Sequence, residues 1–189
     1  MQLNTPNILT LLRIVMIPVL GLVFLLPAPW MNVFAVVIFA LAAVTDWLDG
    51  YLARKLGQTS AFGAFLDPVA DKLIVAVALV ALVTIHASPW LAVPAAIIIG
   101  REIAVSALRE WMAEIGRRAS VKVNVIGKIK TVAQMVAILV LLAGHDIAGI
   151  PLQTIGLWLL YVAAALTLYS MIVYLIAAWR EMQHVDSTP

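Results

Sequence analysis

The sequence predicts an all-α, polytopic membrane protein with six transmembrane helices and both termini in the cytoplasm. Hydrophobic residues make up 64% of the 189 residues and charged residues only 12%, against about 25% charged in an ordinary soluble domain. The apolar residues form runs of the length that crosses a bilayer, about 20 residues each. We therefore expect residues 1–189 to form a single membrane domain. Cysteine is absent, which excludes disulfides and thiol chemistry.

Six apolar runs, separated by charged or turn-forming residues, define the expected helices. Pro27 and Pro29 interrupt the helix after the first run, because proline disfavours helix at and before its own position. The first run lacks a small-x-small cleavage site, so we expect it to be a retained span and not a signal peptide. The predicted helices are Ile8–Leu26, Val33–Arg54, Phe62–Ile85, Trp90–Met112, Val125–Leu142 and Leu152–Trp179.

The basic residues indicate the orientation. If the chain crosses six times, all 12 lysines and arginines fall on one side. Cytoplasmic loops carry the excess of lysine and arginine, so this side, with both termini, is expected to be cytoplasmic. A different number of helices would break the separation. The basic residues are Arg13, Arg54, Lys55, Lys72, Arg101, Arg109, Arg117, Arg118, Lys122, Lys128, Lys130 and Arg180.

Four aspartates lie in the second and third expected helices, where an ionised group is costly and marks a functional site. Asp46 and Asp49 are three residues apart, and Asp67 and Asp71 are four apart, so each pair shares a helix face. The outermost acids, Asp46 and Asp71, lie equally far from the turn, about 12 Å along their helices. Antiparallel packing would bring Asp46 level with Asp71 and Asp49 level with Asp67, forming a box of four carboxylates.

Such a box is suited to hard divalent cations. Carboxylates without histidine or cysteine nearby favour Mg²⁺ or Mn²⁺, and two ions would balance four negative charges. Two-metal sites stabilise the attacking and leaving oxygens in phosphoryl transfer. The small residues Gly50, Ala53 and Gly63 would let a nucleotide approach the ions. Arg54 is placed to contact phosphate oxygens or one of the acids.

Two other interpretations remain open from the residues alone. The acids could be ordinary helix-end charges, solvated or paired with Arg54 and Lys72, or they could form the ion path of a cation transporter. The transporter interpretation is disfavoured because the acids lie at one edge of the membrane. The ionisable residues on the other side are isolated and typical of loops: His86, His145 and Asp146.

The motif D-x2-DG-x2-AR-x8-G-x3-D-x3-D, which spans residues 46–71, resembles the signature of the CDP-alcohol phosphotransferase family at every fixed position. The resemblance implies six transmembrane helices, a homodimer, and metal-dependent transfer of a CDP-linked group to an alcohol with release of CMP. It implies that Asp46, Asp49, Asp67 and Asp71 bind the metal and that Asp71 is also the general base. The implied donor-binding residues are Gly50, Ala53, Arg54 and Gly63, with Asn7 as a further candidate or a helix cap.

Three further segments, around residues 6–13, 100–111 and 127–134, resemble the bacterial family members that use CDP-diacylglycerol as donor and sn-glycerol 3-phosphate as acceptor. The product would be phosphatidylglycerol phosphate, made at the cytoplasmic face of the inner membrane. A dianionic acceptor needs cations, and arginine binds phosphate in a bidentate manner. The candidates are Arg101, Arg109, Lys128 and Lys130. Phosphatidylglycerol or an inositol phosphate remains an alternative acceptor. Membrane lipids are expected partners, and nothing suggests nucleic acid.

Overall fold

The computed structural model describes residues 5–27, 30–56, 61–114, 125–144 and 149–186. These ranges contain six α-helices and no β-strand. The helices are α1 Thr5–Val23, α2 Trp30–Leu56, α3 Ala61–His86, α4 Pro89–Glu114, α5 Val125–Ala143 and α6 Leu152–Asp186.

All six predicted helices are confirmed, and most of their ends agree within three residues. The largest difference is at α6, which continues to Asp186 instead of ending at Trp179. The expected end followed hydropathy, which falls after Trp179. The helix continues into this polar segment because residues 180–186 contain neither proline nor glycine to end it. A tight reversal follows His86: Pro89 begins α4, and the Ser88 carbonyl accepts hydrogen bonds from the amides of Leu91 and Ala92, both at 3.1 Å.

Four of the helices contain segments long and apolar enough to cross a membrane: Trp30–Leu52, Phe65–His86, Pro89–Glu114 and Leu152–Trp179. The apolar parts of the other two, Asn7–Val23 and Ile129–Ala143, are shorter. The apolar surface of α2 has the pattern of a lipid-facing helix, because Val33, Val37, Leu41 and Val44 are exposed at helical spacing. The chain is therefore a membrane protein, while six crossings remain a prediction.

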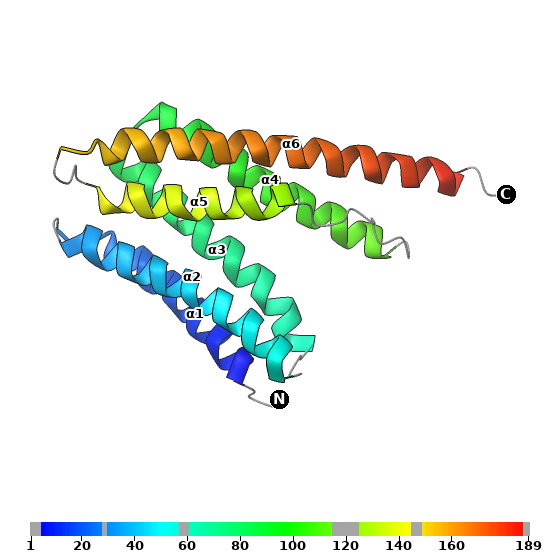
Figure 1. Ribbon diagram of the computed structural model, residues 1–189, viewed down its shortest axis with the longest axis horizontal. Helices are drawn as coiled ribbons and strands as arrows, with labels where there is room; N and C mark the ends of the chain where they lie inside the picture. Colours follow the sequence, from blue (N-terminus) through cyan, green and yellow to red (C-terminus); the bar gives the residue numbers. More distant parts are fainter. Residues whose placement is uncertain (1–4, 28–29, 57–60, 115–124, 145–148, 187–189) are drawn as a thin grey trace.

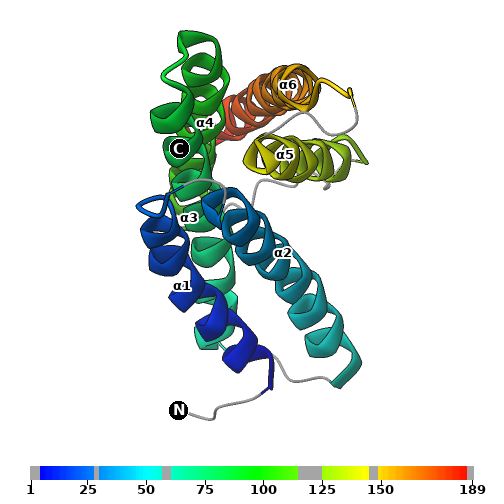
Figure 2. The same ribbon diagram turned by 90° about the vertical axis from the view of Figure 1, so that its left-hand side faces the viewer.

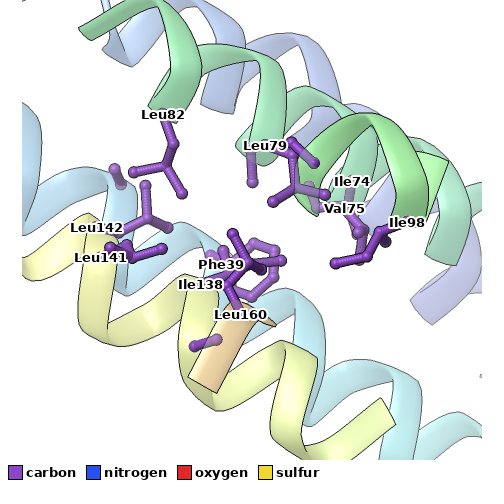
Figure 3. Close-up of a cluster of buried hydrophobic side chains, with 14 of the residues drawn as sticks. Phe39, Ile74, Val75, Leu79, Leu82, Ile98, Ile138, Leu141, Leu142 and Leu160 are labelled. Carbon is purple, nitrogen blue, oxygen red and sulfur yellow. The ribbon is translucent and has the colours of Figure 1, made fainter. Parts of the chain in front are cut away.

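The helices form two groups that meet in a common core. In one group α1 packs against α2 and α3, and in the other α6 packs against α4 and α5 (Figures 1 and 2). Contacts of α2 with α5 and of α3 with α4 join the groups. Figure 3 shows Phe39 of α2 beside Ile138 of α5, with leucines of α3 above them. This apolar core fixes the relative positions of the helices that carry the polar residues described below.

Consecutive helices run in opposite directions. The start of α1, the end of α2 and the start of α3 lie together at the bottom of Figure 1, and the ends of α4 and α6 lie toward the right. The start of α2, the end of α3, the start of α4, the end of α5 and the start of α6 lie toward the left. This arrangement agrees with the alternation assumed when the basic residues were assigned to one side.

Candidate active site

A buried polar stripe on α1 faces the helices that carry the aspartates. Asn7, Thr10 and Arg13 are spaced three residues apart, so they lie along one face of this otherwise apolar helix. Their exposures are only 6%, 1% and 0%. Since α1 packs against both α2 and α3, the stripe lies where those helices present their acidic side chains.

Arg13 binds three of the four aspartates. Its Nη1 atom lies 2.5 Å from Oδ1 of Asp71 and 3.3 Å from Oδ1 of Asp46, and its Nη2 atom donates to Oδ2 of Asp49. The fourth acid, Asp67, accepts a hydrogen bond from the Thr10 hydroxyl. One side of α1 therefore contacts all four carboxylates. Nη1 of Arg13 contacts both Asp46 and Asp71. These two acids therefore lie level with each other on α2 and α3, as their equal distances from the turn predicted.

The four aspartates differ in their access to the surface. Asp49 is nearly enclosed, with 5% of its side chain exposed, whereas Asp46 and Asp71 expose 39% and 37%. A substrate can therefore approach the cluster from the side of Asp46 and Asp71. This is the geometry needed if Asp71 is to take a proton from an incoming hydroxyl.

The donor set suits a hard divalent cation, because it consists of carboxylate oxygens from two helices. With all four acids ionised, the single guanidinium leaves an excess of three negative charges, which further cations would offset. As the side chains stand, however, no group of three or more His, Cys, Asp or Glu among the described residues is already arranged to hold a metal. The guanidinium of Arg13 lies where three of the carboxylates converge. The residues present thus fit a divalent ion in chemistry and charge.

The predicted donor-binding residues are close to this cluster along the chain. Gly50 follows Asp49 on α2 and is partly exposed, whereas Gly63, one turn before Asp67 on α3, is buried. Ala53 and Arg54 lie in the last turns of α2, but their side chains are outside the described part of the structure. Their roles, like that of Asn7, remain predictions.

A second polar cluster joins α4, α5 and α6. Arg101 donates to Glu102 at 2.6 Å and to the Ser170 hydroxyl at 3.1 Å. Lys130 approaches the same Glu102 oxygen at 3.0 Å. Arg101 and Lys130 are 8% and 6% exposed. Two of the predicted acceptor-binding cations are thus brought together, with an acid between them that the sequence interpretation gave no role.

The other two predicted acceptor-binding residues lie differently. Arg109 of α4 donates to the Tyr174 hydroxyl at 2.5 Å, and its guanidinium carbon lies 4.8 Å from the centre of that ring. Arg101 and Arg109 therefore both reach α6, through Ser170 and Tyr174. Lys128 is in the first turn of α5, but its side chain lies outside the described residues.

Hydrogen bonds connect the basic cluster to the neighbourhood of the aspartates. Lys72, adjacent to Asp71 on α3, donates to the hydroxyl of Ser106 on α4, and that hydroxyl donates to the Glu102 carbonyl at 2.5 Å. The alternative interpretation, in which Lys72 pairs with one of the aspartates, is not supported by the contacts of the described residues. Lys72 instead links α3 to the helix that carries Arg101 and Arg109.

Three buried polar atoms near the basic cluster have no hydrogen-bond partner among the described residues. They are Nε of Arg101 on α4, Oε1 of Gln134 on α5 and Oγ1 of Thr167 on α6. Buried polar atoms are normally satisfied by protein or ordered water. The region between α4, α5 and α6 therefore has unused hydrogen-bonding capacity for water or a polar ligand.

Sequence reasoning missed the roles of Arg13, Thr10 and Glu102 in these clusters. Arg13 served to assign a side of the membrane and belonged to the resembling segment 6–13, but it was given no role at the aspartates. A signal was available, because Asn7, Thr10 and Arg13 recur at intervals of three within an apolar helix, which predicts a buried polar face. The sequence offered no comparable signal for Glu102. Its neighbour is Arg101, and an adjacent Arg and Glu are equally compatible with the exposed surface of a helix, so the pair does not indicate a buried acid.

Comparisons with known proteins agree with the resemblance found in the motif. The family model described as CDP-alcohol phosphatidyltransferase matches residues 3–179. Proteins named CDP-diacylglycerol--glycerol-3-phosphate 3-phosphatidyltransferase are similar over nearly their whole length. Those of Escherichia coli K12 and Shigella flexneri serotype 5b are each 54% identical over 182 residues, and that of Sodalis glossinidius is 55% identical over 184. Each match covers 96% of this chain and 98% of the relative. The chain therefore belongs to the CDP-alcohol phosphatidyltransferase family.

Proposed function

We propose that this protein transfers a phosphatidyl group from CDP-diacylglycerol to sn-glycerol 3-phosphate, giving phosphatidylglycerol phosphate and CMP. The observation that carries the proposal is the identity of 54% over 96% of the chain to relatives with that named activity. The convergence of Asp46, Asp49 and Asp71 on one cationic group supports a site for the phosphoryl-transfer chemistry.

Members of this family generally depend on a divalent metal. We propose Mg²⁺ or Mn²⁺, two ions per site, held by Asp46, Asp49, Asp67 and Asp71. When bound, such ions neutralise the diphosphate and stabilise the charge that develops on the leaving CMP oxygen. The family signature assigns Gly50, Ala53, Arg54 and Gly63 to the cytidine diphosphate, and Asn7 could reach it from α1.

Asp71 is the proposed general base. Its carboxylate would take the proton of the acceptor hydroxyl, while the acceptor oxygen attacks the phosphorus nearest the diacylglycerol. The new oxygen–phosphorus bond forms as the bond to CMP breaks, and the electron pair leaves with the CMP phosphate. The Asp71 carboxylate has access to the surface, the side from which the acceptor would approach. Without cysteine in the chain, direct attack is the simpler route.

The acceptor phosphate is proposed to bind at the basic cluster. Arg101, Arg109 and Lys130, with Lys128 at the start of α5, provide the positive charge that a dianionic acceptor requires. The hydrogen bonds from Lys72 through Ser106 to the α4 backbone hold this helix beside the one that carries Asp71. We place the site at the cytoplasmic face of a bacterial inner membrane, in a six-span homodimer.

An assay of CMP release from the purified protein in detergent tests this function. CMP should form from CDP-diacylglycerol only when both glycerol 3-phosphate and Mg²⁺ or Mn²⁺ are present. Phosphatidylglycerol and an inositol phosphate, supplied instead, test the alternative acceptors. Equal turnover with either would overturn the choice of acceptor, and turnover that persists in excess chelator would overturn the metal site. Because detergent removes any membrane gradient, metal-dependent CMP release also argues against a transporter.

A further inference from the structure

Arg13 occupies the position where the proposed metal ligands converge. Its side chain is completely buried, and its two terminal nitrogens contact Oδ1 of Asp46, Oδ1 of Asp71 and Oδ2 of Asp49. Three carboxylates so close together would repel one another without a cation between them. Among the described residues, the guanidinium of Arg13 is the group that performs this task.

A divalent ion and the guanidinium would compete for these three carboxylates. Each contact of Arg13 uses one oxygen of its carboxylate, so acceptor sites remain for an ion, but two cations held by the same carboxylates repel in a buried site. Since the family depends on a divalent metal, ion binding favours the loss of at least some contacts between the guanidinium and the carboxylates.

A released guanidinium needs a new anionic partner, because an unpaired buried charge is strongly unfavourable. The donor's diphosphate, which the ions bring into the same cluster, is an anion that arginine binds well. Arg13 also has capacity beyond its present contacts: its Nε atom is buried without a hydrogen-bond partner among the described residues. A third donor is thus available for a phosphate oxygen.

We infer that Arg13 is a positioning residue that exchanges partners during binding. In the metal-free protein it gathers Asp46, Asp49 and Asp71 into one cluster, and when divalent ions take those oxygens it turns to the phosphate groups of the nucleotide. The inference rests on the proposed function, since it takes the nucleotide-linked donor as the second partner. Its consequence is that metal and nucleotide bind cooperatively, with Arg13 as the link.

Direct measurement of Mn²⁺ binding tests this coupling. The full-length protein in detergent is titrated with Mn²⁺ by calorimetry or by electron paramagnetic resonance, with and without CMP. In the unaltered protein, CMP should tighten Mn²⁺ binding. Arg13→Met removes the competing charge, so Mn²⁺ alone should bind at least about fivefold tighter, the lower end of typical couplings between sites. The effect of CMP on Mn²⁺ affinity should be largely lost.

Two further variants make the result specific. Lys55→Met removes an equal charge from an exposed residue whose ammonium lies over the Tyr51 ring, 5.6 Å from its centre. It should leave Mn²⁺ binding unchanged because solvent screens this charge. Arg13→Lys keeps the charge but offers one nitrogen in place of three, so it should give an intermediate Mn²⁺ affinity and a reduced effect of CMP.

The inference fails if Arg13→Met binds Mn²⁺ no more tightly than the unaltered protein, or if CMP affects both equally. Should Arg13→Met unfold without metal, recovery of the fold by Mn²⁺ but not by K⁺ supports the gathering role. Should it not fold under either condition, Arg13→Lys decides the question, and unchanged Mn²⁺ affinity there overturns the inference. A protein that binds Mn²⁺ as described but releases no CMP with glycerol 3-phosphate would instead contradict the proposed function.

Discussion

Lys130 of α5 and Glu102 of α4 form an ion pair across the helix interface, with Nζ 3.0 Å from Oε1. The same oxygen accepts a hydrogen bond from Arg101 at 2.6 Å. One carboxylate therefore keeps two buried cations close together, although like charges would otherwise separate them. An incoming phosphate would meet cations that are already gathered, which reduces the cost of organising the site on binding.

Replacing Glu102 by Gln should destabilise the protein. The change leaves Arg101 and Lys130 buried without a counter-charge, and the loss of hydrogen bonds to charged groups corresponds to about 1–3 kcal/mol in the free energy of unfolding. Thermal unfolding in detergent measures it. Glu110→Gln, an exposed position on the same helix, is the matched control and should unfold like the unaltered protein. Equal midpoints for the two variants would show that Glu102 does not stabilise the cluster.

Arg109→Ala should raise the KM for glycerol 3-phosphate by about tenfold or more, because it removes a charged hydrogen bond to the acceptor phosphate. The fall in kcat should be smaller. Tyr174→Phe separates charge from position, because it removes the hydrogen bond at 2.5 Å and keeps the guanidinium. Its KM should rise less. Steady-state kinetics with varied acceptor concentration provide both values, and an unaltered KM in Arg109→Ala would remove Arg109 from the acceptor site.

Asp71→Asn should lower kcat by about 100-fold or more, because a general base typically contributes that much and the amide cannot take up the proton. The contact with Arg13 Nη1 can be kept by the amide oxygen, so the fold should survive. CMP release and thermal unfolding are measured together. Glu114→Gln at the exposed end of α4 removes one negative charge away from the cluster and should retain full turnover. Comparable turnover in the two variants would exclude Asp71 as the base.

Gly156→Ala should destabilise the contact between α5 and α6. A Cβ at this position would lie 2.8 Å from Cγ of Leu141 and 3.2 Å from Cγ1 of Val140, and Leu141 is itself buried. Overpacking of this kind costs about 1–3 kcal/mol. At Gly21, by contrast, a Cβ would meet no atom within 4 Å, so Gly21→Ala should be neutral or slightly stabilising, since alanine favours helix. A lower midpoint for Gly156→Ala alone supports the close approach of the helices.

Much of the fold followed from local features of the sequence. Apolar runs and prolines predicted six helices, and the distances of Asp46 and Asp71 from their turn predicted that these acids lie level. Hydropathy alone missed the polar end of α6, because a helix can continue beyond the segment that contacts lipid. Hydropathy also indicated six spans; four helices have apolar segments long enough to cross a membrane, and crossing by α1 and α5, whose apolar segments are shorter, stays a prediction.

The sequence by itself determined the helices, the aspartate pairs and the family, because helical periodicity, charge and motif spacing act over a few turns of one chain segment. The tertiary structure alone decided which cation meets which acid. Arg13 contacts Asp71 across 58 positions, and Lys130 contacts Glu102 across 28. Such pairs form only when packing of the apolar core brings distant helices together, so no local pattern could assign Arg13 to the carboxylates or place Glu102 between two buried cations.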